Sequence, residues 1–300
     1  MNTKLILDTD IGSDVDDAWA LALCLASDKI DLLGVTLVHA DLETRAKITL
    51  KMLKLANRLD VPVYKGMSKT LANEDQYLWG GHEGADTDFS DIEGLKAQEG
   101  AVDFILNTVE QFPGEVVVCP VGPLTNIGEA IRRSPETMRK VKKLAIMGTT
   151  FLGEGPDAAE HEHNGWVDPV ATKIVLESGI PATIVGCNVT LRVLARREEM
   201  QSIEGTPFGN YLAIMTHQYY DLCKRDWTYM HDPLAVAAVI DPSIVKTRKL
   251  RAEVLEESGR VAYYPASETE NALDVCIDVE VERFEKMLMS TISSFASKSA

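Results

Sequence analysis

Short runs of β-branched and other apolar residues alternate along the chain with longer amphipathic stretches. The apolar runs predict strands, and the stretches with apolar residues at helical spacing predict helices. The predicted strands are KLILDT, DLLGVTLV, VPVY, EVVVCPV, VKKLAIMG and PATIVGCNV. The predicted helices run from about Asp16 to Ser27, Leu42 to Leu59, Gly100 to Gln111 and Leu124 to Arg133, and another begins at Asp168. This alternation is typical of βα units, so we expect an α/β fold with an open, mainly parallel, Rossmann-like sheet flanked by helices on both faces.

The C-terminal part of the chain follows a different pattern. RAEVLEESGRVAYY predicts a hairpin that turns at Ser258-Gly259, and ERFEKMLMSTISSFA predicts a closing helix. We see no linker that would divide the chain, so we expect a single domain over residues 1–300. The loops Lys65–Gln98 and Thr149–Val167 are long for a compact domain. Open α/β sheets hold their ligand sites in loops at the carboxyl ends of strands.

Five aspartates gather in the ten residues Asp8–Asp17, at the end of the first predicted strand. Unpaired carboxylates this close raise one another's pKa and cost stability. A helix N-terminus explains one or two of them, with Asp14 as the N-cap and Asp16 and Asp17 in the first turn. It does not explain all five.

Two kinds of cation site compete as explanations of the acidic stretch. An EF-hand loop requires a Glu at its twelfth position, where this chain has Trp19 or Leu21, depending on the residue at which the loop starts. We therefore favour a site for Ca²⁺ or Mg²⁺ at the tip of the strand, with Asp10 and Asp17 as oxygen ligands. The cation then offsets the repulsion between the carboxylates.

Composition narrows the classes of function. The formal net charge of −16 argues against general affinity for nucleic acid or for anionic membranes. The longest apolar run, Ala18–Ala26, is too short to cross a bilayer. The N-terminus enters a strand without a signal-peptide pattern, and five scattered cysteines fit reduced thiols better than a disulfide framework. We expect a cytoplasmic protein.

The acidic stretch resembles the N-terminal signature of the inosine/uridine-preferring nucleoside hydrolase family, D-T-D-P-G-x-D-D-A-x-A-L. Here Ile11 replaces the proline, and two extra residues precede the Asp16-Asp17 pair, as in the branch with the longer motif. The resemblance implies that Asp10 and Asp17 are Ca²⁺ ligands and that Asp16 contacts a ribose hydroxyl. It leaves open whether Asp14 shares one of these roles.

Two further segments imply the rest of the metal site. HDPLAVA resembles the family's second metal motif and implies that Asp232 is a ligand and that His231 lies near the leaving group. By itself, Asp232 would be interpreted as an N-cap before Pro233. VCPVGPLTNIGEAI resembles a segment in which a backbone carbonyl, here that of Val121, completes the metal shell.

Three more segments imply contacts to the substrate. AEHEHNGWVDP resembles the family segment that implies Glu162 and Asn164 as contacts of the ribose hydroxyls. LLGVTLVHADLETRAK implies Asp41 as a contact of the ribose or of its water network. WGGHEGAD resembles the loop that brings a histidine over the base, so His82 is a candidate acid, although an exposed loop histidine explains it equally well. The matching segments keep the family order over about four-fifths of the chain.

Together, the matches imply a Ca²⁺-dependent N-ribohydrolase that cleaves small-molecule ribonucleosides to free base and ribose. A water activated by the ion would attack the sugar with Asp10 as general base, and His231, His82 or both would protonate the base. Five aromatic residues are expected near the pocket mouth: Tyr77, Trp79, Tyr219, Trp227 and Tyr229. Of these, we expect Trp227 or Tyr229 to stack on the base. The family habit implies a homodimer or homotetramer, and the preferred base stays open.

Three alternatives remain beside this interpretation. The first is hydrolysis of another N-riboside, such as nicotinamide riboside, and the second is a riboside-binding protein without catalysis. The third is phosphoryl transfer, because Asp8-Thr9-Asp10 resembles the D-x-D start of haloacid-dehalogenase-like phosphatases. We find no convincing match for the later motifs that those phosphatases require.

Overall fold

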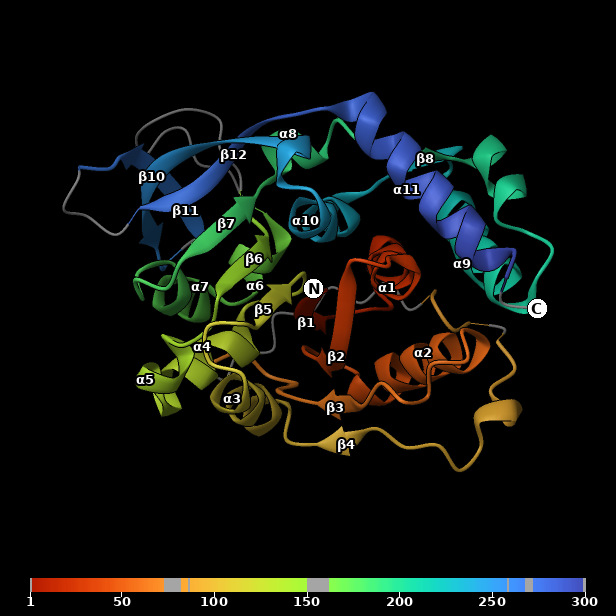
Figure 1. Ribbon diagram of the computed structural model, residues 1–300, viewed down its shortest axis with the longest axis horizontal. Helices are drawn as coiled ribbons and strands as arrows, with labels where there is room; N and C mark the ends of the chain where they lie inside the picture. The colour runs from red at the N-terminus through yellow and green to blue at the C-terminus, as the bar shows by residue number, and fades with distance from the viewer. Residues whose placement is uncertain are drawn as a thin grey trace.

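The computed structural model describes residues 2–72, 82–85, 87–149, 162–257, 259–267 and 272–298. Within these ranges, ten strands form one sheet in the order β11-β10-β12-β7-β6-β5-β1-β2-β3-β4 (Figure 1). The strands are β1 (Thr3–Thr9), β2 (Ile30–Leu37), β3 (Val63–Lys65), β4 (Gln98–Glu99), β5 (Val117–Pro120), β6 (Lys143–Met147), β7 (Ala182–Val185), β10 (Val245–Leu255), β11 (Arg260–Pro265) and β12 (Leu273–Val279).

The sheet is mainly parallel, which confirms the predicted fold class. Strands β1 to β7 run parallel to their neighbours, and β12 runs parallel to β7. Strand β10 pairs antiparallel with both of its neighbours, β11 and β12. From β1 the chain first builds the sheet toward β2, β3 and β4, and then returns to place β5, β6 and β7 on the other side. The strand order therefore reverses between β1 and β5, which is where open α/β sheets bind ligands.

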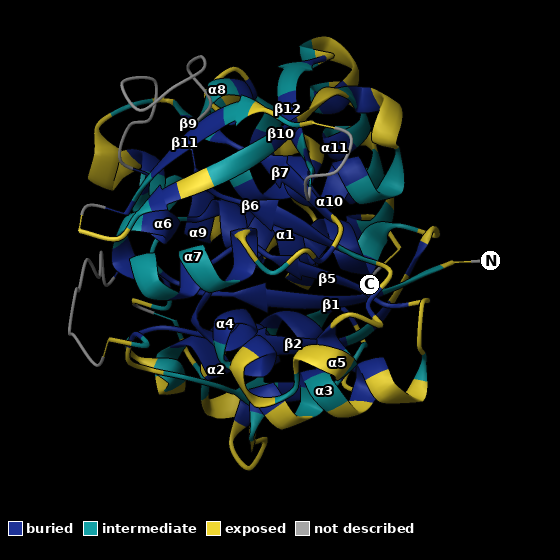
Figure 2. Cartoon of the chain, turned by 90° about the vertical axis from the view of Figure 1, so that its left-hand side faces the viewer, coloured by how far each residue is buried: buried dark blue, intermediate teal, exposed yellow. Residues whose placement is uncertain are grey.

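Helices cover both faces of the sheet. They are α1 (Asp16–Ala26), α2 (Leu42–Leu55), α3 (Ala101–Gln111), α4 (Thr125–Arg133), α5 (Pro135–Met138), α6 (His163–Val167), α7 (Pro169–Leu176), α8 (Cys187–Thr190), α9 (Pro207–Cys223), α10 (His231–Ile240) and α11 (Val281–Ala296). Helices α1, α9, α10 and α11 pack together on one side, and α3, α4, α5 and α7 on the other (Figure 1). Figure 2 shows the sheet between them as a buried layer.

The alternation of side chains along β1 explains why both faces are covered. Leu5 and Leu7 belong to the apolar cluster beneath α1 and α10, whereas Ile6 belongs to the cluster beneath α3 and α4. All three side chains are fully buried. A strand that is apolar on both faces is typical of a central parallel strand, because each face is packed against helices.

Two predicted elements have different limits in the structure. The strand predicted over PATIVGCNV ends at Val185, and Cys187–Thr190 form α8. The chain leaves the sheet here because the backbone N–H of Cys187 donates to the carbonyl of Thr149 instead of continuing the ladder. The helix predicted from Leu42 to Leu59 ends at Leu55, where Asn57 adopts a left-handed conformation.

The remaining short elements lie outside the main sheet. They are a second sheet of β8 (Leu194–Arg196) and β9 (Trp227–Tyr229) and the 3₁₀ turns Ser90–Ile92, Arg197–Ser202 and Pro242–Ile244. Among the described residues, no helix has the length and apolarity needed to cross a membrane.

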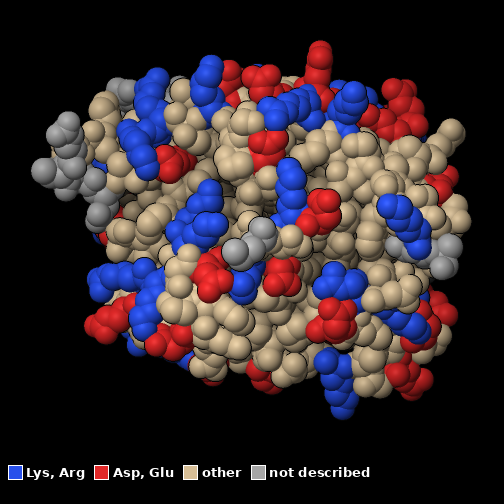
Figure 3. All heavy atoms as spheres, in the orientation of Figure 1, with Lys and Arg blue, Asp and Glu red and all other residues tan. Residues whose placement is uncertain are grey.

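Basic and acidic side chains are interspersed on the face seen in Figure 3. The excess of acidic residues, which gives the net charge of −16, therefore does not form a single acidic patch on that face. Several carboxylates are buried instead, and most of them lie at the carboxyl edge of the sheet: Asp8, Asp10, Asp16, Asp17, Glu83, Glu162, Asp168 and Asp232.

Candidate active site

A pocket of about 330 Å³ opens at the carboxyl edge of the sheet, beside the point where the strand order reverses. This volume lies within the range of small-molecule sites. The residues that line the pocket come from the ends of several strands and the beginnings of several helices: Asp10, Ser13, Asp14, Asp16, Asp17, Val121, Met147, Glu162, His163, Asn164, Cys187, Tyr219, His231 and Asp232.

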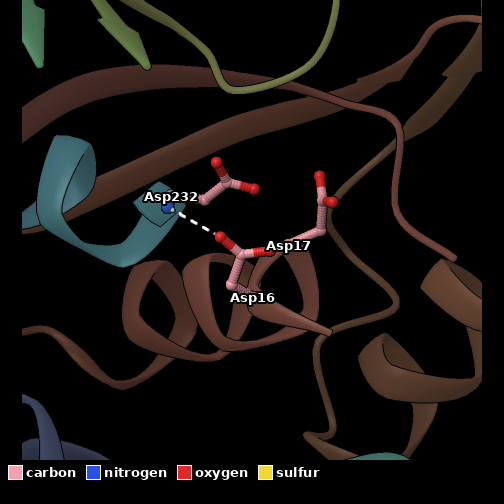
Figure 4. A group of neighbouring side chains, drawn as sticks. All are labelled: Asp16, Asp17 and Asp232. Carbon is pink, nitrogen blue, oxygen red and sulfur yellow. Dashed lines mark hydrogen bonds between the residues drawn. The ribbon is translucent and has the colours of Figure 1, made fainter. Parts of the chain in front are cut away.

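Three of these residues, Asp16, Asp17 and Asp232, form a buried carboxylate trio (Figure 4). One oxygen atom from each lies within 4.8 Å of the others, although Asp16 and Asp17 begin α1 and Asp232 lies in the first turn of α10. The backbone N–H of Asp232 donates to Asp16 Oδ2 at 3.1 Å, which joins the two helix ends.

The trio has the chemistry of a site for a divalent cation. Burial raises the pKa of all three carboxyl groups well above the ordinary value, and repulsion between the acids raises it further. Buried carboxylates of one sign are costly unless they are protonated or paired with a cation. Carboxylate oxygens are the ligands of hard cations such as Ca²⁺ and Mg²⁺, so the trio can hold a metal ion.

Asp10 and Asp17 are positioned by the end of β1. The hydroxyl of Thr9 donates to Asp17 Oδ1, and the backbone N–H of Ile11 donates to Thr9 Oγ1 at 3.1 Å. Asp10 is 4% exposed and lies directly against Gly122. A Cβ atom at Gly122 would lie 2.6 Å from Asp10 Oδ1, so only glycine allows this approach between the segments after β1 and β5.

A fully buried guanidinium lies behind Asp10. Arg45, on α2, has no exposed surface, and its Nη2 lies 3.8 Å from Asp10 Oδ2. Arg45 also donates to the carbonyls of Ile11 and His39 at 2.9 and 2.7 Å, and to Ser13 Oγ at 3.2 Å. It thereby connects the acidic loop to the turn after β2, where His39 adopts a left-handed conformation that is unfavourable for a residue other than glycine.

The segment at α6 supplies a second side of the pocket. Glu162 caps α6 and accepts hydrogen bonds from the backbone N–H groups of Asn164, Gly165 and Thr149 at 2.8 to 3.0 Å. Asn164 Nδ2 donates to the carbonyl of Val121 at 2.7 Å. Burial raises the pKa of the Glu162 carboxyl, and the three N–H donors oppose this rise.

His231 opens α10 and lies in the pocket wall. Its Nδ1 is 2.6 Å from the hydroxyl of Thr190 at the end of α8. Burial, helped by the positive charge of Arg225, lowers the pKa of His231 to about 4. The imidazole is therefore neutral at pH 7, and only one of its two nitrogens carries a proton.

The comparisons with known proteins agree with this arrangement. The family model for the inosine-uridine preferring nucleoside hydrolases matches residues 5–286. The chain belongs to this family. It is an enzyme of the nucleoside hydrolase class, and both the predicted family and the predicted fold are confirmed.

Several known proteins align with most of this chain. Uridine nucleosidase 1 of Arabidopsis thaliana is 30% identical over 263 residues, which cover 82% of this chain and 76% of that protein. Pyrimidine-specific ribonucleoside hydrolase RihB of Escherichia coli is 30% identical over 267 residues, with coverage of 85% and 84%. The solved structure of a purine-preferring ribonucleoside hydrolase from Gardnerella vaginalis has a TM-score of 0.89 at 31% identity and covers 98% of this chain and 99% of that one.

Within this nucleoside hydrolase chain, the structure brings most of the predicted site residues together. Asp10, Asp17, Val121 and Asp232, the predicted metal ligands, all line the pocket, as do Asp16, Glu162, Asn164 and His231. The buried trio includes Asp16, which the resemblance assigns to the ribose, whereas Asp10 lies beside the trio. The predicted role of each residue stays a prediction.

Two predicted site residues do not line the pocket. Asp41 is exposed and caps α2, where its carboxylate accepts from the N–H groups of Glu43 and Thr44 and from the Thr44 hydroxyl. Its carboxylate is therefore engaged in the helix cap, and the ribose contact that the resemblance implies stays a prediction. His82 is buried, its ring lies 5.1 Å from that of the pocket residue Tyr219, and burial lowers its pKa.

The expected helix caps and aromatic contacts also differ. Val15 and Met230 are the N-caps of α1 and α10, so neither Asp14 nor Asp232 has the capping role that its position suggested. Tyr219 lines the pocket, whereas Trp227 and Tyr229 are not among the residues that line it. The other two candidate aromatics, Tyr77 and Trp79, lie outside the described residues.

Sequence reasoning missed three residues that position the site: Arg45, Thr9 and Thr190. The signal for Arg45 is its place on the buried stripe of α2, in helical register with Ile48, Thr49 and Met52. A cation on an apolar stripe points to a buried acidic partner. Thr9 and Thr190 act through single hydrogen bonds, and no sequence pattern indicated them.

Proposed function

We propose that this nucleoside hydrolase is a Ca²⁺-dependent N-ribohydrolase, which cleaves ribonucleosides to free base and ribose. The observation that carries the proposal is the buried carboxylate trio in a pocket that also contains Asp10 and His231. A cation site, a candidate base and a candidate donor to the leaving group thus lie in one small cavity. One similar protein is named as pyrimidine-specific and another as purine-preferring, so their names do not indicate which base this enzyme prefers.

The residues that would hold the ion are Asp17 and Asp232, with Asp10 and the carbonyl of Val121 as further oxygen ligands. Their hard oxygen atoms suit Ca²⁺, and the repulsion between the buried carboxylates, which raises their pKa, would be relieved by a divalent cation between them. When bound, Ca²⁺ supplies a Lewis acid that lowers the pKa of a coordinated water and orients it.

Residues of the chain carry out proton transfer and bind the substrate. Asp10 accepts a proton from the attacking water, whose oxygen forms the new bond to C1′ while the bond from C1′ to the base breaks. The bonding electrons pass to the base nitrogen. Positive charge develops on the sugar, and the carboxylates around the pocket stabilise it. Glu162 and Asn164 bind ribose hydroxyls, which fixes the sugar over the trio.

The leaving base needs a proton or a strong hydrogen bond, and His231 is placed to supply one. When the Thr190 hydroxyl donates to Nδ1, the single ring proton is on Nε2. The neutral imidazole then offers Nε2–H to the base. The lowered pKa of His231 supports this neutral donor instead of an imidazolium.

The proposal also covers the domain organisation, the assembly and the location of the protein. We expect one domain over residues 1–300, because strands from Thr3 to Val279 share one sheet. A homodimer or homotetramer and a cytoplasmic location stay predictions. The five cysteines are free thiols, which is compatible with the second of these.

The decisive experiment is a panel of purine, pyrimidine and nicotinamide ribosides, scored for free ribose with and without a chelator. We expect ribose release that a chelator abolishes and Ca²⁺ restores. Asp232→Asn should bind Ca²⁺ much more weakly by calorimetry and lose activity. Asp241→Asn is the matched control, because Asp241 also lies at a helix end but is outside the pocket.

Each alternative predicts a different result. Binding of ribosides by calorimetry without ribose release would support a binding protein and contradict hydrolysis. Release of phosphate from p-nitrophenyl phosphate with Mg²⁺, without release of ribose, would support phosphoryl transfer. Ribose release that survives complete chelation would contradict the role of the ion.

A further inference from the structure

The hairpin of β10 and β11 reaches the sugar side of the pocket from behind. Strand β11 packs against α6, the short helix that Glu162 caps. No residue of these two strands lines the pocket, and the proposed mechanism gives the hairpin no role. Two residues of the hairpin, Gly259 and Tyr263, nevertheless lie against the two segments that hold the Glu162 carboxylate.

One oxygen of this carboxylate receives two backbone donors from separate segments. Thr149, which follows β6, donates its N–H to Glu162 Oε2 at 2.8 Å, and Gly165 in α6 donates to the same atom at 3.0 Å. The N–H of Asn164 donates to the other oxygen, Oε1, at 2.8 Å. The direction of the carboxylate therefore depends on where the backbone holds Thr149 and Gly165.

Thr149 holds its place in a conformation that is unfavourable for its residue type. Its φ of 65° is left-handed, a region that β-branched residues rarely adopt. Such a conformation persists only where the surrounding contacts impose it. Here the hydroxyl of Thr149 lies 2.6 Å from the hydroxyl of Tyr263 on β11, and its carbonyl accepts from the N–H of Cys187 at 2.9 Å. Tyr263 is 1% exposed, so water does not compete for this contact.

The turn of the hairpin lies against the second donor. Gly259 has a φ of 66°, and a Cβ atom there would lie 2.5 Å from the carbonyl oxygen of Gly165. Only glycine therefore allows the turn to approach α6 this closely. The hairpin thus contacts both residues whose N–H groups meet at Glu162 Oε2.

We propose that the hairpin of β10 and β11 sets the direction of the Glu162 carboxylate, with Tyr263 as a positioning residue for ribose binding. The inference rests on the proposed function, in which Glu162 binds a ribose hydroxyl. Tyr263 acts through Thr149, whose N–H it keeps directed at Oε2. Without the Tyr263 hydroxyl, one of the contacts that impose the left-handed backbone is lost. Thr149 then relaxes, and the carboxylate turns away from the sugar.

The test is a double-mutant cycle on kcat/KM, measured with the riboside that the wild type cleaves best. Tyr263→Phe keeps the ring in its apolar cluster and removes only the hydroxyl. It should lower kcat/KM about 10-fold, because a displaced contact to the substrate loses much of its value. In Glu162→Ala, which has no carboxylate to orient, the same change should alter kcat/KM by less than about 2-fold.

Tyr264→Phe is the matched control. Tyr264 is the next residue on β11, so its side chain points to the other face of the sheet, where its ring lies 4.3 Å from the Arg251 guanidinium. We expect it to leave kcat/KM unchanged with and without the Glu162 carboxylate.

Substitutions of Thr149 test the other partner of the contact. Thr149→Val keeps the branched shape without the hydroxyl and should reproduce the loss in Tyr263→Phe. Thr149→Ser keeps the hydroxyl and should retain most of the wild-type kcat/KM.

Three results would overturn the inference. One is a wild-type kcat/KM in Tyr263→Phe, even with a lowered Tm, and another is a wild-type kcat/KM in Thr149→Val. The third is an equal loss with and without the Glu162 carboxylate, which would show that Tyr263 only stabilises the fold. If Tyr263→Phe does not fold by circular dichroism, Tyr263→Phe combined with Thr149→Val leaves neither hydroxyl without its partner and completes the same cycle. Failure of the proposed function is different, because no riboside would then release ribose in the wild type.

Discussion

Replacing Arg45 with Met tests whether the buried guanidinium holds the acidic loop in place. The change removes the donors to the carbonyls of Ile11 and His39 and to the hydroxyl of Ser13, and it leaves Asp10 without its nearby positive charge. Met fills a similar volume, so the loss reflects the polar contacts more than a cavity.

The magnitude follows from the burial of these contacts. Removal of one partner from a buried ionic network costs about 3–5 kcal/mol. Two buried carbonyls that lose a donor cost about 1–3 kcal/mol each, and the two figures overlap because they describe the same contacts. We expect a loss of about 4 kcal/mol in the free energy of unfolding, or about 6 °C in Tm at ~2.1 cal/mol/K per residue.

The assay is urea unfolding, followed by both tryptophan fluorescence and circular dichroism, together with the rate of ribose release. Asp10 should also shift in Arg45→Met, and kcat should fall by about 10²-fold. Arg45→Lys keeps the charge without the planar fork and should lie between wild type and Met. Arg58→Met is the control, because Arg58 forms an ion pair with Asp60 at the surface and should cost about 1 kcal/mol or less.

The reasoning is refuted if Arg45→Met costs no more stability than Arg58→Met. It is also refuted if Arg45→Met keeps the wild-type kcat while it loses the expected stability. In that case Arg45 would stabilise the loop without positioning Asp10.

Three further predictions follow from the site. His231→Ala should lower kcat for inosine by about 10²-fold and affect p-nitrophenyl riboside much less, since that leaving group needs no proton; equal losses on both substrates would reject the donor role. The carboxyl groups of the trio have a higher pKa in the folded, metal-free protein than in the unfolded chain, so the folded protein binds more protons. This proton binding stabilises the fold at low pH, and the stabilisation is lost as the pH rises through the folded-state pKa values. Ca²⁺ must displace those protons, so its affinity should rise as the pH rises through the folded-state pKa values of the trio. Calorimetry in buffers of different ionisation enthalpy measures the proton release, and binding without proton release would contradict the raised pKa values. Gly122→Ala should lower kcat about 10-fold or more with little change in the far-ultraviolet spectrum, because the new Cβ would lie 2.6 Å from Asp10 Oδ1; a wild-type kcat would show that this close approach is unimportant.

Local patterns in the sequence were sufficient for the fold class. Six strands could be predicted because each is an apolar run, and the parallel sheet follows from the helices between them: β1, β2, β3, β5, β6 and β7. The exposed two-residue strand β4 (Gln98–Glu99) has no such run and was not predicted. The antiparallel pairing of β10 and β11 was also predicted, because apolar and polar residues alternate on both sides of the turn predicted at Ser258-Gly259; Ser258 itself lies outside the described residues. The limits of α8 could not be predicted, because a hydrogen bond between Cys187 and Thr149 ends the ladder of β7 there.

The sequence also indicated which acids belong to the site. The motifs at Asp16-Asp17 and at Asp232 could be recognised directly in the sequence. In the structure these residues lie together in one pocket, in agreement with the family to which the chain belongs. The sequence predicted a pocket contact for Asp41 because its position in the chain matched a family segment. In the structure its carboxylate caps α2, which depends on how the turn after β2 is folded, and its contact with the ribose stays a prediction.

Only the tertiary structure shows which distant residues contact each of these acids and His231. A sequence motif names residues that are close along the chain, but hydrogen bonds and burial depend on partners that are far away in it. Tyr219 reaches Asp14 from α9, Arg45 reaches Asp10 from α2, and Thr190 reaches His231 from α8. Each of these partners is supplied by the packing of helices around the carboxyl edge of the sheet, which is why no local pattern could reveal it.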